Sequence, residues 1–306
     1  MAEINVNIKK ESTILNERTI LNEKLVYKKK ITKRELIELW VKRFFLIIAI
    51  VIIIFPIFAI VSASISTGTS FMQKNLIPTA ITIENYKKAL SDNVGFVKWM
   101  TNTTLVAILV STIQLVMTLP AAFAFSRLKF KGRTKGLMTL LILQMFPSTM
   151  SVPAILAVAY KIPFGMDNLI FLSLILCAGS AYNIWLMKGY IDGLPKELDE
   201  AARVDGATTW QVFTKIILPL TKSMAVVIFF FSFIAIYGEF VFSAALLKDK
   251  ELKTLIIGLK SFTSGKLTDW PMYSACSIMV SIPLAVLFVS IQKFISRGLV
   301  SGAVKE

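Results

Sequence analysis

The chain has 306 residues, of which 55% are hydrophobic and only 17% are charged, which is less charge than a soluble domain of this length carries. It contains no histidine, so a Ser-His-Asp triad, an HExxH zinc site and a histidine proton relay are excluded, and we expect no metal site. The net charge of +15 does not indicate a nucleic-acid partner, because the basic residues lie between apolar runs and not on one soluble face.

The first 43 residues are a polar tail with charges of both signs. Its last part, 32–43, fits an interfacial helix that leads into an apolar run, and a flexible tail fits equally well. The apolar run begins at Phe44 with no small-residue cleavage site of a signal peptide before it. We therefore expect a retained membrane helix from this point.

Six apolar runs are each long enough to cross a bilayer as a helix. About 30 Å of hydrocarbon requires about 20 residues at 1.5 Å per residue. Four of the runs contain proline, which indicates bent helices whose freed carbonyls are satisfied by neighbouring groups. The prediction is an all-α membrane protein with six transmembrane helices, at 44–63, 103–125, 137–160, 168–187, 223–247 and 272–292.

The distribution of Lys and Arg predicts the orientation in the membrane. One side holds 24 of these residues and the other holds 10, and the basic side of a membrane protein is cytoplasmic. Both termini are therefore expected in the cytoplasm, as tails at 1–43 and 293–306 on either side of a transmembrane domain at 44–292. The cytoplasmic loops are then 127–136 and 188–222, and the outer segments are 67–100, 161–167 and 248–271.

The cytoplasmic connection at 188–222 is predicted to form two short helices. Pro195 suits a first helical position, where its missing N–H costs nothing. Gly206 is expected to end the first helix in the left-handed conformation, and Thr208 or Thr209 can cap the second.

Both short helices have an apolar face that needs a surface to pack on. Glu200 lies beside two alanines that allow close approach, and its carboxylate can pair with an arginine or with amides of a partner. The periodicity fits a partner protein as well as it fits the lipid headgroups or the chain's own helices. The apolar positions are Leu198, Ala201 and Ala202 on the first helix, and Trp210, Phe213, Ile216 and Ile217 on the second.

The same loop carries seven residues at fixed gaps, Glu200-Ala201-Ala202-x3-Gly206-x9-Ile216-x-Leu218-Pro219. At every fixed position this pattern resembles the EAA motif of binding-protein-dependent import permeases. The resemblance implies the type I ABC importer permease fold. It also implies that the loop is a coupling helix that docks into a cleft on a cytoplasmic ATPase subunit.

Further segments resemble the MalG-like branch of these permeases, which imports oligosaccharides such as maltose and maltodextrin. They are QMFP at 144–147, IWLMKGY at 184–190, DGATTW at 205–210 and the glycine-rich end at 298–305. In that branch the C-terminal tail, here with Gly298 and Gly302, reaches into the interface between two ATPases. The YGEF at 237–240 departs from the WNEF of many members.

The resemblance implies an assembly with a second permease subunit, two ATPase subunits and an extracytoplasmic solute-binding protein. The outer segments 67–100 and 248–271 are the natural landing surface for the binding protein. ATP would be used by the partner ATPases, and this chain would bind no cofactor and catalyse no reaction. The segment 258–266 is no phosphate loop, because it has six residues between its glycines instead of four, and Leu267 follows the lysine.

Glu239 is the only ionisable residue well inside an expected span. A carboxylate is costly in lipid, so it should face the bundle interior or a wet path. It is a candidate for the translocation path, and a hydrogen-bonded structural acid is an equally good interpretation.

Three alternatives remain. The solute of such an importer can be another sugar or glycerol phosphate. A self-sufficient secondary transporter would require ion-coupling acids or inverted repeats in its spans. A membrane enzyme would require a polar catalytic cluster near one interface.

Overall fold

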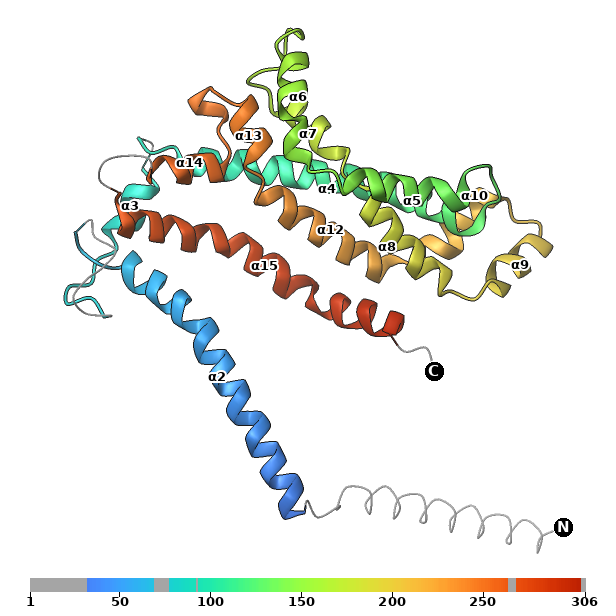
Figure 1. Cartoon of the computed structure of the whole chain (residues 1–306), viewed down its shortest axis with the longest axis horizontal. Coiled ribbons are helices and arrows are strands. Elements are labelled where there is room, and N and C mark those ends of the chain that lie inside the picture. The colour runs from blue at the N-terminus through green and yellow to red at the C-terminus, as the bar shows by residue number, and fades with distance from the viewer. Residues whose placement is uncertain (1–31, 69–76, 92, 264–267, 304–306) are drawn as a thin grey trace, which may run out of the picture. The chain divides into compact units, whose positions relative to one another are not determined.

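Every regular element in the described part of the chain is a helix, as the sequence predicts (Figure 1). The computed structural model describes residues 32–68, 77–91, 93–263 and 268–303, so most of the N-terminal tail and Lys266 and Leu267 lie outside it. The chain divides into two compact units, Met1–Phe58 and Ala59–Glu306, which are described separately below.

The first unit contains most of helix α2, Lys33–Ser64. Thr32 and Glu35 begin it with a reciprocal cap, in which Thr32 N–H donates to Glu35 Oε2 (2.8 Å) and Glu35 N–H donates to Thr32 Oγ1 (3.3 Å). The residues expected to be an interfacial helix or a flexible tail are therefore the first turns of one continuous helix. It is long and apolar enough to cross a membrane.

Two further helices are long enough to cross a membrane without a break. They are α4, Phe96–Arg127, and α15, Trp270–Ala303. In the second unit α4 is central and packs against α7, α8 and α12, and α15 packs along α12 (Figure 1). Because α15 continues beyond the expected end of the last span, Gly298 and Gly302 fall within its final turns.

The remaining expected spans are bent or interrupted helices. The third consists of α5, Arg133–Gln144, then η1, Ser148–Ser151, and α6, Val152–Ala159, with a bend of 79°. The fourth consists of α7, Leu169–Cys177, and α8, Ala181–Asp192, with a bend of 48°. The bent pairs bring the helices that could cross a membrane to as many as six in the described residues.

The fifth expected span, 223–247, is not one helix. Helix α12, Lys222–Tyr237, ends at Gly238, and α13, Val241–Leu246, begins three residues later. Before α12 the chain bends by 75° after α10, Thr209–Val212, a π-helical turn η2, Phe213–Ile217, and α11, Leu218–Leu220.

The positions of the prolines do not by themselves predict where these helices break. Pro56, Pro120 and Pro283 lie inside unbroken helices, whereas Pro147 lies in the break after α5 and Pro153 in the first turn of α6. The break between α7 and α8 contains glycine and no proline, as does the break between α12 and α13. Polar side chains satisfy backbone groups at these two breaks, as described below.

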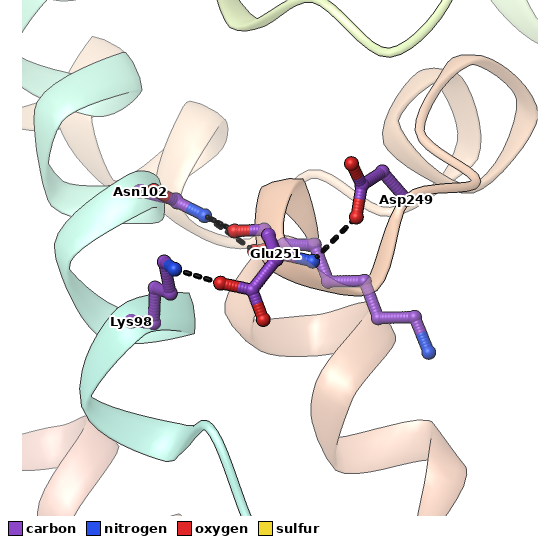
Figure 2. A network of polar contacts seen from close by, with 5 residues as sticks. Lys98, Asn102, Asp249 and Glu251 are labelled. Atoms are coloured by element: carbon purple, nitrogen blue, oxygen red, sulfur yellow. Dashed lines mark hydrogen bonds and ion pairs between the residues drawn. The ribbon is translucent and has the colours of Figure 1, made fainter. Parts of the chain in front are cut away.

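The loops of the second unit meet at two ends in the groups that the basic-residue count predicts. At one end Asp167 Oδ1 accepts a hydrogen bond from Asp249 N–H (2.7 Å). Figure 2 shows the contacts beside it, in which Asn102 Nδ2 donates to the Glu251 carbonyl (2.9 Å) and Lys98 pairs with the Glu251 carboxylate. The shorter helices are α3, Glu84–Ala89, η3, Lys250–Leu252, and α14, Leu255–Ser261, at this end, and α9, Glu197–Val204, at the other.

Gly258 has a packing role. A Cβ atom at this position would overlap the indole ring of Trp99. Helix α14 therefore lies against α4 at a distance that only glycine allows. The packing against Trp99 therefore explains why residue 258, in the segment that superficially suggests a phosphate loop, is glycine.

Candidate functional site: a cytoplasmic helix pair and a polar cavity

Helix α9 ends in a Schellman motif at Gly206, as the sequence predicts. Gly206 has φ +84°, and its N–H donates to the Arg203 carbonyl (3.0 Å). The N–H of Ala207 donates to the Ala202 carbonyl (2.9 Å), which completes the motif. Pro195 lies ahead of the helix and not at its first position, because Lys196 is the N-cap.

Of the two candidate caps for the second short helix, Thr208 is the one used. Its Oγ1 accepts from Gln211 N–H (3.3 Å), and its own N–H donates to Gln211 Oε1 (2.7 Å). Gly206 and this cap together fix the turn between α9 and α10. Between α9 and α10 this turn contains no helix or strand.

The motif residues and the apolar residues beside them divide between a packed face and an exposed face. Val212, Phe213 and Ile217 are buried against α4 and α8, Ala202 packs at the edge of this cluster, and Ile216 and Leu218 are half-buried. Glu200, Ala201, Gly206 and Pro219 are exposed.

Several apolar side chains are exposed beside Glu200. Val204 is 88% exposed, Trp210 67% and Leu198 42%. Trp210 belongs to the predicted apolar face, and its ring contacts that of the buried Phe213 (centroids 5.3 Å apart), while most of its side chain stays exposed. An apolar patch around a carboxylate therefore faces away from the chain.

A buried ion pair holds α9 to the end of α4. Arg127 Nε lies 2.5 Å from Asp199 Oδ2, and the two side chains are 4% and 9% exposed. Arg127 Nη2 also donates to the Leu194 carbonyl (2.9 Å). The sequence analysis missed this pair. The available signal was an acid on the first turn of α9 and an arginine directly after an apolar span.

A cavity of about 1050 Å³ lies among helices α4 to α8, α12 and α13. Its polar lining includes three amides, several hydroxyls and one carboxylate, and its lining residues include no Lys or Arg. The amides and the carboxylate are Gln114, Gln144, Asn183 and Glu239.

Three of these side chains cap the helix breaks around the cavity. Gln114 Nε2 donates to the carbonyl of Leu176 (2.9 Å), at the end of α7. Gln144 Oε1 accepts from Tyr182 N–H (3.1 Å), in the first turn of α8. Glu239 caps the start of α13 by accepting hydrogen bonds from its backbone N–H groups. Such caps are required because a broken helix in lipid leaves backbone groups that water cannot reach.

Both carboxylate oxygens of Glu239 are used. Oε1 accepts from Phe242 N–H (2.7 Å), and Oε2 accepts from Ser243 N–H (3.0 Å) and Ser243 Oγ (2.5 Å). Glu239 thus lies between two helices and not inside a continuous span. It lines the cavity and also stabilises the backbone, so the two interpretations of this residue are compatible.

Comparison with known proteins identifies the family. The model of a family described as the binding-protein-dependent transport system inner membrane component matches residues 116–301, more than half of the chain. The chain belongs to this family. The matched part includes the α9–α10 pair, the helix breaks and every described cavity-lining residue except Gln114.

Curated relatives in this permease family carry sugar-transport names. The galactooligosaccharides transport system permease protein GanQ of Bacillus subtilis is 34% identical, over 89% of this chain and 97% of its own length. The maltodextrin permease MdxG of the same species is 34% identical (85% and 94%), and the maltose/maltodextrin permease MalG of Escherichia coli is 31% identical (89% and 98%).

A solved structure confirms the fold. A chain in the crystal structure of a bacterial ABC transporter involved in the import of the acidic polysaccharide alginate superposes with a TM-score of 0.73 at 23% identity, over 87% of this chain and 99% of that chain. The protein is therefore an inner-membrane permease subunit of an ABC sugar importer with the type I fold. It is not an enzyme, because ATP hydrolysis in these systems belongs to separate subunits.

Proposed function

We propose that this permease carries a neutral oligosaccharide of the maltodextrin type across the cytoplasmic membrane by alternating access. Its assembly comprises a second permease subunit, two ATPase subunits and an extracytoplasmic binding protein. ATP is bound and used by the ATPases, and this chain binds no cofactor. ATP-driven closure of the ATPases turns the coupling helices and opens the cavity toward the loaded binding protein.

The charge of the cavity lining is the observation that carries the choice of solute. Among the described residues that line the cavity, Glu239 is the one carboxylate and none is Lys or Arg. A phosphate or a uronate would be repelled here and would lack a cationic partner. The lining therefore favours a neutral sugar over glycerol phosphate, in agreement with the sugar names of the relatives.

The coupling role is supported by the exposed face of the helix pair. Glu200 and Ala201 lie at the surface, and Val204 and Trp210 expose apolar area beside them. An ATPase cleft that covers this patch would gain apolar burial together with a charge-assisted hydrogen bond to Glu200. Both termini then lie in the cytoplasm, and the C-terminal end of α15 with Gly298 and Gly302 lies on the side of the ATPases.

The test is uptake by the complete transporter in proteoliposomes that contain ATP. We expect radiolabelled maltotriose to enter only with ATP inside and binding protein outside, and unlabelled glycerol phosphate at a tenfold excess to leave the rate unchanged. Uptake that continues without ATP would indicate a secondary transporter instead. ATP-dependent uptake of radiolabelled glycerol phosphate, with no uptake of maltotriose, would refute the choice of a neutral sugar.

A further inference from the structure

The cavity contains more hydrogen-bonding capacity than the helix breaks use. In the described part of the chain Gln144 spends only Oε1 on the backbone of Tyr182, so both hydrogens of its Nε2 are left for another acceptor. Asn183 Nδ2 donates to Ser232 Oγ (2.9 Å), and its Oδ1 is left for another donor. Two donors and an acceptor therefore line one cavity on neighbouring helices.

Aromatic rings lie in the same lining. Tyr182 on α8 is 57% exposed, Phe231 on α12 is 52% exposed, and Phe146 in the bend after α5 is 64% exposed. Exposed aromatic faces beside amides suit a ligand with apolar C–H faces and hydroxyl edges, which is the surface of a pyranose ring. The volume of the cavity is at the upper end of the roughly 300–1,000 Å³ that small-ligand pockets occupy.

The capping arrangement makes this lining rigid. Gln144 is held by the first turn of α8, and Glu239 by the first turn of α13. A ligand that uses the remaining groups of these residues meets side chains that are already positioned, so little conformational entropy is lost on binding. Three of the roughly four acceptor sites of the Glu239 carboxylate are taken by its donors, so the amides and the rings supply most of the contacts to a sugar.

We propose that this chain contributes its own oligosaccharide subsite, in which Tyr182 is the ring platform and Gln144 and Asn183 bind sugar hydroxyls. The inference deepens the proposed function and depends on it. It assigns direct sugar contacts to this subunit, in addition to any contacts that the second permease makes.

Site-specific alkylation tests this inference in the complete transporter. The native thiols are removed with Cys177→Ala and Cys276→Ala, and a reporter thiol is added either by Ala178→Cys or, as a control, by Tyr160→Cys, so that Tyr182 stays in place. Ala178 is exposed and lines the cavity, whereas Tyr160 is exposed, at 71%, but does not line it. Maltotriose with its binding protein should slow alkylation at position 178 by roughly fivefold or more and leave position 160 unchanged.

A second pair of variants separates contact from folding. Tyr182→Phe keeps the ring and should transport maltotriose at nearly the wild-type rate, whereas Tyr182→Ala should lose roughly tenfold. Equal alkylation with and without maltotriose, or full transport by Tyr182→Ala, would overturn the subsite while wild-type uptake leaves the proposed function standing. Failure of the wild type to transport maltotriose would instead overturn the proposed function, and the subsite with it.

Discussion

The guanidinium of Arg127 and the carboxylate of Asp199 join the last turn of α4 to the first turn of α9 through a buried ion pair. Arg127 ends the central helix of the second unit, and Asp199 is the neighbour of Glu200 on the exposed helix. On the proposed coupling role, a displacement of α9 would be transmitted to α4 through this ion pair. Since α4 also lines the cavity through Gln114, one helix connects the two parts of the site.

Removing one partner of this pair should be costly. Asp199→Ala leaves a buried guanidinium without its counter-charge, which costs about 3–5 kcal/mol. Thermal unfolding of the purified chain in detergent should therefore shift strongly. The matched control is Glu84→Gln, which breaks the exposed Lys87–Glu84 pair and should change stability by less than about 1 kcal/mol. Equal small shifts in both variants would show that the buried pair does not hold α9.

Substitutions of Glu239 should rank by the number of backbone donors that they leave without an acceptor. Glu239→Gln keeps one carbonyl oxygen for the start of α13, and Glu239→Leu keeps none, so each freed N–H costs about 1–3 kcal/mol. We expect the glutamine variant to fold and to have altered uptake or altered ATPase coupling, and the leucine variant to be worse. Wild-type uptake in both variants would leave Glu239 as a dispensable acid.

Reporter fusions should place the two ends of the second unit on opposite sides of the membrane. Fusions near Lys131 and Lys215 should report from the cytoplasm, and fusions near Lys87 and Lys260 from outside, because the side that includes both terminal tails holds 24 of the 34 Lys and Arg residues. The side of the membrane is measured at each site by the activity of a fused alkaline phosphatase and of a fused cytoplasmic reporter. A cytoplasmic signal from the 67–100 segment would contradict six spans.

Local sequence patterns were sufficient for the spans and for the geometry of the cytoplasmic loop. Gly206 and Thr208 act through hydrogen bonds to residues at most five positions away, so their roles follow from short-range rules. The apolar lengths likewise identify the membrane helices, because the bilayer has a fixed thickness.

The helix breaks were not predictable in this way. The break between α7 and α8 is stabilised by side chains from other helices, Gln114 and Gln144, and three of the prolines that seemed to mark bends lie in unbroken helices. The Arg127–Asp199 pair also joins residues far apart in sequence. Neither periodicity nor composition carries information on such contacts, and the fold has to bring the groups together first.

The central claim is that the helix pair around Glu200 and Gly206 is where an ATPase binds. Gly206 has φ +84° with no atom near its missing Cβ, so Gly206→Val acts through backbone strain of at least about 1 kcal/mol and re-aims α9. Glu200→Ala removes a charge-assisted hydrogen bond worth about 1.5–3 kcal/mol. Gly189→Val is the matched control, since Gly189 has equal space but lies in a regular helix.

The most direct measurement is the ATPase activity that co-purifies with the tagged chain from membranes, normalised to the amount of chain. Wild type and Gly189→Val should bring down full activity, Glu200→Ala clearly less and Gly206→Val very little. All four should be present in the membrane at equal amounts, because none of the changes introduces a charge into a span. Full co-purified activity together with full sugar uptake in both Glu200→Ala and Gly206→Val would contradict the account and make this loop an ordinary amphipathic connection.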